Sequence, residues 1–339
     1  MKIAYLTYGI GSKAMGLGKY SWYLVEGLRK LGVDVDVYTT SFHRKGVGAP
    51  VFFFKNAFLN LKNYDLVHSS ECSGLLVSHG YMVETYHHYY KQTFNVNSLV
   101  FSYLENIQCR KAKRIIVPSF KTKEDLVREG FSEDKIDVIH HGVDSDLFKP
   151  DQALRNFIRN KYGLVNSFVV ISVGRLVYHK RHVDIIEALS RVPNSVFVLV
   201  GAGEEEERIK VKAIEFGVRL LRFKGVSDEF LVGLYNSADV YAHASILEGF
   251  GLTILEAMAC SLPVVCYDVA DLRRVVSGAG HLLQPGDTGG MTSALLLIKD
   301  DASNRHVLSE MALRQSRAFT WEKTAVEHLN VYRRILTSS

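Results

Sequence analysis

The sequence predicts an α/β protein with two domains, each built around a parallel β-sheet wrapped by helices. The chain has 339 residues, which is long for one hydrophobic core and suits two. Short apolar runs with strand character alternate with helix-like segments, as in a parallel sheet with crossover helices. This alternation breaks once, over residues 146–164, and resumes at the apolar run Phe168–Val173. We therefore expect the hinge between the domains there.

The N-terminal series holds six short runs that we expect to form strands. The first run leads into a glycine loop and lacks the long apolar segment and cleavage site of a secretion signal, so a cytoplasmic location is expected. Helices are expected near Lys19–Leu31 and Ser98–Lys111. The six strands are expected at Lys2–Tyr8, Val33–Thr39, Leu66–Ser69, Met82–Tyr86, Arg114–Val117 and Ile136–Ile139.

The C-terminal series repeats this pattern after the hinge. A last segment, Trp321–Leu336, carries apolar residues at helical spacing and is expected to pack as a final helix. The six strands of this series are expected at Phe168–Val173, Val196–Val200, Leu220–Phe223, Val240–His243, Pro263–Cys266 and His281–Leu283.

Composition favours a soluble globular protein. Hydrophobic residues make up 47% of the chain and charged residues 23%. No apolar stretch reaches the roughly 18 residues that a membrane-spanning helix needs. The four cysteines show no spacing typical of a metal site, so we expect buried free thiols, without zinc or disulfides. They are Cys72, Cys109, Cys260 and Cys266.

Positive charge is concentrated in the N-terminal domain. Residues 1–115 hold 14 lysines and arginines against 7 acidic residues. Such a domain can attract an acidic acceptor, an anionic membrane or nucleic acid, but no nucleic-acid recognition motif accompanies the charge. A basic cluster follows a partly apolar helix and suggests peripheral docking on anionic lipid, although a solvated helix end explains it too. The basic residues are Arg110, Lys111, Lys113 and Arg114, and the apolar ones are Leu99, Val100, Phe101, Tyr103 and Leu104.

The segment from Glu248 to Glu256 indicates a site for an anion joined to a sugar. Gly249 and Gly251 leave the backbone N–H groups accessible, and the helix that follows directs its positive end at the same place. The two carboxylates would repel phosphate and suit hydroxyl groups. The alternative is that Thr253 is an N-cap and Glu256 closes a capping box, which would make Glu256 structural.

A basic loop follows the first strand of the C-terminal series. Gly174 and Arg175 come directly after Phe168–Val173, and Lys180 and Arg181 follow before the next helix. Ligands of open α/β sheets bind at this edge of the sheet. A guanidinium and an ammonium there can neutralise a departing diphosphate, while Arg181 is equally well explained as a solvated residue.

Glycine pairs also raise the possibility of a nicotinamide oxidoreductase. The pairs Gly9–Gly11, Gly16–Gly18 and Gly201–Gly203 each give Gly-x-Gly, but none completes the dinucleotide fingerprint. Glu206 takes the place of the last glycine in the third, and the acidic run 204–207 would repel a pyrophosphate. The loop Gly9–Gly18, which contains Gly16, is a candidate for contact with a phosphate or an acceptor hydroxyl, and flexibility alone explains its glycines about as well.

Two Asp-x-Asp sequences are possible metal ligands, but their contexts argue against it. Asp34 and Asp36 lie in an alternating strand, and Asp144 and Asp146 lie in a turn near the hinge. We therefore expect no metal and assign cationic roles to Arg175 and Lys180.

His87 is the preferred site candidate among His68, His79, His87, His88, His140 and His141. It would lie where the strand Met82–Tyr86 ends, and a neutral imidazole there can hydrogen-bond a sugar hydroxyl. His79 is the second choice, and either ring is also compatible with a purely structural role.

Together these motifs resemble glycosyltransferase family 4, and the resemblance runs over nearly the whole chain. Its most specific parts are the loop Gly174–Lys180 and the pair Glu248 and Glu256 around Gly-Phe-Gly. Further matching segments are His141–Asp144, Gly16–Gly18, Asp65–His68, Val117–Ser119, Val200–Gly203, Ala238–Val240, Leu262–Val265, Pro285–Asp287 and Phe319–Glu322.

The resemblance implies the GT-B architecture, two Rossmann-like domains with parallel sheets facing a central cleft. Residues 1–153 would bind the acceptor, residues 154–320 would bind the nucleotide sugar, and the C-terminal helix 321–339 would cross back to the first domain. This predicts a retaining, metal-independent transferase of a hexose from a nucleoside diphosphate sugar to a hydroxyl acceptor, a sugar or lipid-linked sugar. The alternative is a non-catalytic nucleotide-sugar-binding or partner protein on the same fold.

The same resemblance implies roles for individual residues. Arg175 and Lys180 would hold the diphosphate, Glu256 the ribose hydroxyls and Glu248 the donor sugar, with His87 also at the sugar. The remaining donor-binding candidates are Gly16, Gly18, Gly174, Val226, Gly249, Phe250, Gly251 and Leu252. The chain departs from the family pattern at Ser261, usually glycine, and at Arg274, commonly glutamate. A retaining glycosidase would instead need two carboxyl groups about 5 Å apart, one of them a nucleophile.

Overall fold

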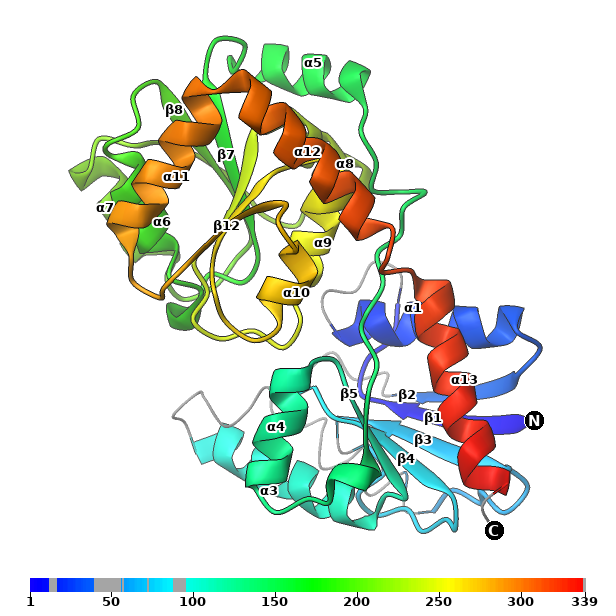
Figure 1. The fold of residues 1–339 in the computed structure, drawn as a ribbon. Coiled ribbons are helices and arrows are strands. Elements are labelled where there is room, and N and C mark those ends of the chain that lie inside the picture. Colours follow the sequence, from blue (N-terminus) through cyan, green and yellow to red (C-terminus); the bar gives the residue numbers. More distant parts are fainter. Residues whose placement is uncertain (12–16, 40–55, 57, 72, 88–95, 338–339) are drawn as a thin grey trace. The chain divides into compact units, whose positions relative to one another are not determined.

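The computed structural model describes residues 1–339 apart from 12–16, 40–55, 57, 72, 88–95 and 338–339. The chain divides into two compact units (Figure 1). Unit 1 comprises residues 1–142 and 321–339, and unit 2 comprises residues 143–320.

Unit 1 contains a six-stranded sheet in the order β2-β1-β3-β4-β5-β6, and all its strand pairs are parallel. The order reverses between β1 and β3. The strands are β1 (Lys2–Thr7), β2 (Asp34–Thr39), β3 (Leu66–Ser70), β4 (Met82–Thr85), β5 (Arg114–Val117) and β6 (Ile136–Val138). The helices are α1 (Leu17–Lys30), α3 (Val96–Lys111), α4 (Phe120–Arg128), the 3-10 turn Glu133–Lys135 and α13 (Trp321–Thr337).

Unit 2 contains a second parallel sheet of six strands, in the order β12-β11-β10-β7-β8-β9. Its strands are β7 (Phe168–Val173), β8 (Ser195–Val200), β9 (Arg219–Phe223), β10 (Val240–His243), β11 (Val264–Tyr267) and β12 (Gly280–Leu283). Its helices are α5 (Gln152–Lys161), the 3-10 turn Tyr178–Lys180, α6 (His182–Leu189), α7 (Glu206–Glu215), α8 (Asp228–Ser237), α9 (Leu252–Ala259), α10 (Leu272–Val276), α11 (Thr288–Asp300) and α12 (Ala302–Ser316). Two parallel-sheet domains are therefore confirmed.

The central strands of unit 2 are buried on both faces. Along β7, Val169 and Ile171 enter one hydrophobic cluster, whereas Phe168 and Val170 enter the cluster on the other face. A strand covered on both sides has no polar face, which explains why these strands are continuous apolar runs in the sequence. Of the cysteines, Cys260 and Cys266 are buried free thiols, Cys109 is also buried, and Cys72 lies outside the described residues.

Helix α13 belongs to unit 1. The amphipathic pattern predicts a final helix, and the family resemblance predicts that it returns to the first domain. It packs on α1, where Trp321 stacks on Tyr23 with ring centroids 4.9 Å apart. Gly27 of α1 has no side chain to keep the helices apart, since a Cβ there would lie 2.7 Å from the Cβ of Ala325. Figure 1 shows α13, in red, beside α1.

The boundary between the units differs from the sequence expectation. Residues 143–153, which we assigned to the N-terminal domain, belong to unit 2. The backbone N–H of Val143 donates to the carbonyl of Phe319 over 3.0 Å, and Phe148 is buried in the unit 2 core. Helix α5 then packs on α8. The polar turn at 144–151 therefore lies inside unit 2, and the sequence break over 146–164 falls within unit 2 rather than at the crossing point.

Candidate functional site

Two of the predicted loops of unit 2 begin at neighbouring strand ends. Strands β7 and β10 pair in parallel, and the strand order reverses between them. Such a switch point leaves a crevice at the carboxyl ends of the two strands, where open α/β sheets bind ligands. Strand β7 ends at Val173 and leads into the basic loop, and β10 ends at His243 and leads to Glu248.

The basic loop is fixed by close backbone contact with the loop after β8. The Leu176 N–H donates to the carbonyl of Ala202 over 3.0 Å, and Leu176 itself is buried. A Cβ on Gly201 would lie 1.8 Å from the carbonyl oxygen of Gly174, and one on Gly203 would lie 2.1 Å from that of Leu176. The pair Gly201–Gly203 therefore has a packing role, and between these contacts Arg175 is exposed.

The loop after β7 is also joined to the loop after β10. The N–H of Ile246 donates to the carbonyl of His179 over 2.9 Å. One residue further on, the Lys180 ammonium forms an ion pair with the Glu248 carboxylate, and both side chains are largely buried. The structure thus brings together two predicted site residues that lie 68 positions apart in the sequence.

Glu248 has a second partner that sequence reasoning missed. The ring Nε2 of His243 lies 2.6 Å from Glu248 Oε1, the same oxygen that Lys180 contacts, and Oε2 has no hydrogen bond within the described part of the chain. Burial raises the pKa of the Glu248 carboxyl, but Lys180 and His243 outweigh burial and hold this pKa far below its ordinary value. Glu248 is therefore an ionised carboxylate with one oxygen left to accept a hydrogen bond.

Gly251 sets the geometry of the turn before α9. Its φ of +95° lies in the left-handed region that favours glycine, and it is the N-cap residue of α9. A Cβ there would also lie 2.9 Å from Leu272. Because α9 begins at Leu252, Thr253 lies inside the helix and the capping-box alternative for Glu256 is wrong. The first-turn N–H groups of α9 carry no side-chain cap.

The side chains along this turn have different surroundings. Phe250 is buried in the unit 2 core with its ring 5.9 Å from Phe319, so only its backbone is placed to bind a ligand. Glu256 is 9% exposed and accepts a hydrogen bond of 3.0 Å from the Tyr235 hydroxyl of α8. Val226, predicted to line the donor site, follows the edge strand β9 and packs partly against the core.

In unit 1, the structure separates the two histidine candidates. Both ring nitrogens of His79 lie within 3.2 Å of backbone atoms of Tyr64 and Tyr81, which gives this ring a structural role. His87 follows β4, and its Nε2 lies 3.2 Å from the Ser70 hydroxyl. Its Nδ1 has no hydrogen-bond partner in the part of the chain that is described. Burial, helped by His328, lowers the pKa of His87 to about 3, so the ring is neutral.

The remaining candidates of unit 1 lie at the start of α1 or form contacts with other side chains of unit 1. Gly18 is buried in the first turn of α1, with its carbonyl 3.3 Å from the N–H of Gly11, and Gly16 lies outside the described residues. Asp36 accepts a 2.6 Å hydrogen bond from the Tyr64 hydroxyl and pairs with Lys2.

Two family models match the chain, one for each half. The model described as Glycosyl transferases group 1 matches residues 155–315, and the model described as Glycosyltransferase Family 4 matches residues 15–147. The first match contains all of the loops at the switch point of unit 2.

Known proteins of similar sequence carry glycosyltransferase names. O-antigen chain mannosyltransferase B of Escherichia coli is 29% identical over 231 residues, which is 66% of this chain and 61% of that protein. D-inositol 3-phosphate glycosyltransferase of Xylanimonas cellulosilytica is 33% identical over 233 residues, 64% of this chain and 56% of that protein. The matched part of the chain thus spans about three fifths of the length of these relatives.

Solved structures of the same fold cover the whole chain. Sucrose-phosphate synthase from Thermosynechococcus elongatus superposes with a TM-score of 0.84 at 23% identity, over 100% of both chains. HepE of Anabaena, solved in complex with UDP-glucose, gives a TM-score of 0.75 at 21% identity, also over 100% of both chains. The expected GT-B fold is thereby confirmed.

Proposed function

The chain belongs to glycosyltransferase family 4, and from this premise we propose that it moves a hexose from a nucleoside diphosphate sugar to a hydroxyl acceptor, with retention of anomeric configuration and without a metal ion. One observation carries the proposal. The cationic residue Lys180 and the carboxylate Glu248 meet where β7 and β10 end, beside the uncapped N-terminus of α9. Cations and helix N–H groups suit a diphosphate, and the carboxylates suit sugar hydroxyls.

Each residue then has a role that its position permits. Arg175 and Lys180 bind the diphosphate, and the N–H groups of Gly251 and Leu252 add hydrogen bonds. Glu256 binds the ribose hydroxyls and Glu248 the hexose. A diphosphate would compete with Glu248 for the Lys180 ammonium, and this exchange would free Oε1 of Glu248 for a sugar hydroxyl.

In the proposed reaction, the bond from the anomeric carbon to the diphosphate oxygen breaks and the acceptor oxygen forms a bond on the same face. The leaving phosphate takes the acceptor proton, so no protein nucleophile is required. Negative charge builds up on the diphosphate, where Arg175 and Lys180 stabilise it; such contacts are commonly worth several kcal/mol, roughly 3. The names of the relatives, a mannosyltransferase and inositol phosphate glycosyltransferases, support a hexose donor.

Donor binding is tested by thermal stabilisation with UDP-, GDP- and ADP-sugars in the presence of EDTA. A ligand at a hundred times its Kd adds about 2.7 kcal/mol to stability. We expect one nucleotide series to stabilise the protein and the double variant Arg175→Ala, Lys180→Ala to lose this effect. The matched control is Lys210→Ala, which removes an exposed cation of α7 in the same unit. Stabilisation that needs added metal, or that survives in the double variant, would contradict the proposed donor site.

Turnover and stereochemistry are tested separately with the stabilising donor. Release of the nucleoside diphosphate in the presence of sugar acceptors is expected, and the anomeric proton of the product should show the donor configuration by NMR. Binding without release for any acceptor would leave a nucleotide-sugar-binding protein, and an inverted product would exclude the retaining mechanism.

We also propose peripheral contact with an anionic membrane through α3 and the residues after it. Val100 and Tyr103 are 51% and 67% exposed, and Arg110, Lys111 and Lys113 are exposed at the end of the helix and just beyond it. Each basic residue near an anionic surface contributes about 1 kcal/mol. Cosedimentation with phosphatidylglycerol vesicles should be lost in the double variant Lys111→Glu, Lys113→Glu and kept in the control Lys62→Glu. If the parent protein does not bind the vesicles, the proposed contact is refuted.

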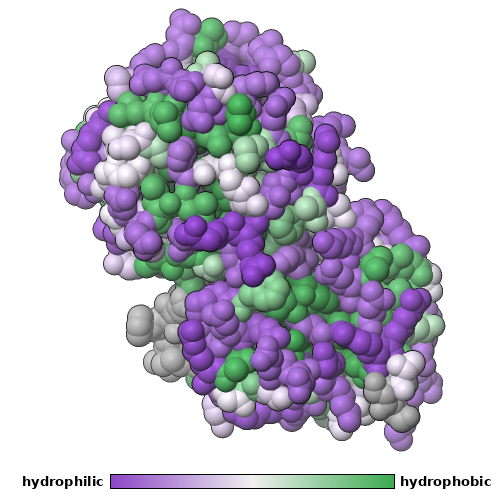
Figure 2. Space-filling model, in the orientation of Figure 1, coloured by the Kyte–Doolittle hydropathy of each residue, from purple (hydrophilic) through white to green (hydrophobic). Residues whose placement is uncertain are grey.

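None of the described helices is long and apolar enough to cross a membrane. On the face drawn in Figure 2, hydrophobic side chains lie in separate groups among hydrophilic ones. The cytoplasmic location remains a prediction from the sequence.

A further inference from the structure

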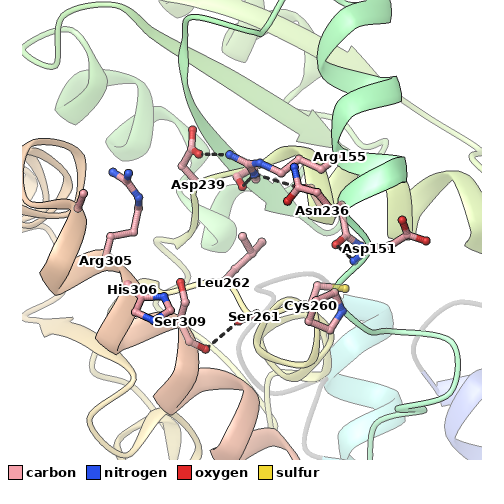
Figure 3. A pocket seen from close by; sticks show the side chains of 14 residues that line it. Asp151, Arg155, Asn236, Asp239, Cys260, Ser261, Leu262, Arg305, His306 and Ser309 are labelled. Carbon is pink, nitrogen blue, oxygen red and sulfur yellow. Dashed lines mark hydrogen bonds and ion pairs between the residues drawn. The ribbon is translucent and has the colours of Figure 1, made fainter.

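A cavity of about 610 Å³ lies in unit 2 at the amino edge of the sheet. Asp239 and Leu262 line it just before β10 and β11 begin, so it lies at the opposite ends of these strands from His243 and Glu248. Its volume is in the range of small-molecule sites. The other walls come from the start of α5 and the first turns of α12, as Figure 3 shows.

The acidic residues in the cavity wall are engaged within the protein. Asp239 accepts hydrogen bonds from Arg155 at 2.5 Å, from Arg159 at 3.2 Å and from the N–H of Val169 at 2.7 Å. Asp151 caps α5 by accepting from the N–H of Leu154 over 2.9 Å. One negative charge at Asp239 thus faces two guanidinium groups, and this wall does not present an unbalanced acid to a ligand.

The wall formed by α12 carries hydrogen-bond donor groups that are only partly used within the described structure. Arg305 uses Nη1 to bind the carbonyl oxygens of Ile298 and Lys299, at 2.9 and 3.1 Å. Its Nε and Nη2 make no hydrogen bond to any described residue. His306 and Ser309 line the same wall (Figure 3), and the Nε2 of His306 lies 3.5 Å from a carboxylate oxygen of Glu310, a contact that a bound anion would have to displace. A guanidinium, an imidazole and a hydroxyl on the first two turns of one helix are suited to bind the oxygens of an anion.

The cavity wall also holds a strained residue. Ser261 has a φ of +64°, in the left-handed region that favours glycine, and its hydroxyl donates to the carbonyl of Ser309 over 3.0 Å. This bond ties the end of α9 to α12 beside the open donors of Arg305. Strain of this kind persists where the surroundings hold it, and it is often found at binding sites.

We propose that this cavity binds a small phosphorylated sugar. The phosphate would be held by Arg305, His306 and Ser309 on α12. The hydroxyl groups would face the start of α5, where the carboxylate oxygen of Asp151 that does not cap the helix and the side-chain carbonyl of Gln152 can accept hydrogen bonds. This site is separate from the proposed donor site and does not depend on it.

Isothermal titration of the full chain with mannose 6-phosphate, inorganic phosphate and mannose tests the proposal. We expect both phosphate compounds to bind, mannose 6-phosphate more tightly, and mannose alone not to bind. Arg305→Glu should weaken mannose 6-phosphate binding at least tenfold. The matched control Arg314→Glu makes the same charge change at an exposed position of α12 outside the cavity and should bind like the parent.

Two further variants separate folding and donor-site effects from loss of the site. His306→Glu adds a carboxylate at a side chain that is 73% exposed, so it should weaken binding without disturbing the helix contacts that Arg305 makes. Lys180→Ala alters the proposed donor site and should leave the affinity unchanged. The proposal is overturned if the folded parent shows no binding of mannose 6-phosphate at concentrations up to roughly 20 mM, where even a site with a millimolar Kd would be filled. It is also overturned if mannose binds as tightly as mannose 6-phosphate, or if Lys180→Ala is the only variant that abolishes binding.

Discussion

At the scale of single residues, Glu248 is held by two side chains of the candidate site. Its Oε1 is shared between Lys180 and His243, while its Oε2 makes no hydrogen bond within the described structure. A carboxylate held in this way keeps its charge and its orientation before any donor arrives. Such preorganisation reduces the reorganisation that ligand binding would otherwise require.

We expect His243→Leu to destabilise unit 2 by about 1–3 kcal/mol, because a buried carboxylate loses a short hydrogen bond. The measurement is urea unfolding followed by far-UV circular dichroism. The matched control is His306→Leu, which changes an exposed histidine and should have little effect. If His243→Leu were as stable as the parent, the 2.6 Å contact between His243 and Glu248 would not contribute to the free energy of unfolding.

Glu256 and its partner Tyr235 give a second test at this scale. In Glu256→Gln, the side chain keeps its size but loses the negative charge that suits ribose hydroxyls, so donor affinity should fall about tenfold or more, roughly 1.4 kcal/mol. Tyr235→Phe keeps the carboxylate and removes one hydrogen bond of 3.0 Å, so its effect should be smaller. Titration calorimetry with the stabilising donor measures both. The opposite ranking would make Glu256 a structural residue.

The predictable residues were those next to a strand end or a glycine turn. Lys180 and Glu248 could be proposed because each follows a strand of the sheet, and the structure shows them in contact. His243 ends a strand too, the same signal that pointed to His87, and could have been found by applying it consistently. Tyr235 could not, because it lies on α8 and reaches Glu256 only through tertiary packing.

At the scale of elements, strand positions were predicted to within one or two residues. The central strands of unit 2 are buried on both faces, so each of them is a short apolar run that can be located in the sequence. The start of α9 was less predictable. Thr253 and Glu256 have capping-box spacing, but the left-handed conformation of Gly251 starts the helix earlier, and the local pattern does not reveal that choice.

The two loops at the carboxyl edge of unit 2 depend on glycine at Gly203. In Gly203→Ala, the new Cβ would lie 2.1 Å from the carbonyl oxygen of Leu176, so the backbone of the basic loop must move. We expect a loss of stability of more than about 2 kcal/mol and weaker donor binding. Gly289→Ala in α11 is the control, because its Cβ meets nothing closer than 3.8 Å. Thermal unfolding measures the stability of both variants. Equal stability would contradict this role of Gly203.

Four buried histidines give unit 1 a sensitivity to acid. Burial lowers the pKa of His87 to about 3 and of His328 to about 4, and it also lowers the pKa values of His68 and His141. In the unfolded chain, an ordinary histidine pKa is about 6.5. The unfolded state therefore binds more protons below that pH, and stability is lost as the pH falls from about 6.5 toward 4.

We expect each such histidine to cost about 1.4 kcal/mol per pH unit over this range. Both tryptophans, Trp22 and Trp321, belong to unit 1, so their fluorescence during urea unfolding reports on this unit. In His328→Gln, the amide can keep the contacts with Tyr20 and Thr324. The number of protons taken up on unfolding, which sets the slope of the unfolding free energy against pH, should fall by about one. An unchanged slope would mean that His328 is already protonated in the folded state.

At the scale of the whole molecule, unit 1 needs both ends of the chain. Helix α13 supplies buried side chains to it, including Trp321, Leu329 and Tyr332. A chain that ends at Thr320 should therefore show Trp22 emission like that of the unfolded protein, while unit 2 keeps a cooperative urea transition by circular dichroism. A chain that ends at Thr337 keeps the helix and is the control. Native-like Trp22 emission in the shorter chain would show that unit 1 folds without α13.

The two-domain division could be predicted from the repeated strand pattern, but the crossing points could not. The resemblance placed the first boundary at residue 153, and the chain enters unit 2 at Val143 because of one hydrogen bond to Phe319 and the burial of Phe148. The Val143–Phe319 bond and the contact of the Phe148 ring with Tyr235 of α8 join segments that lie far apart in sequence, which no local pattern records. The position of the last helix was predictable, since its amphipathic face extends over the whole segment.

The hydrogen bond between Val143 and Phe319 bears on the order of events during synthesis on the ribosome. The chain leaves and re-enters unit 1 at adjacent residues, so unit 2 is complete once residue 320 has emerged, whereas unit 1 still lacks α13. The half encoded first therefore matures last. Its partly formed sheet must wait through the translation of residues 143–320 with apolar surface uncovered, and a ribosome paused there would hold a nascent chain that chaperones can bind.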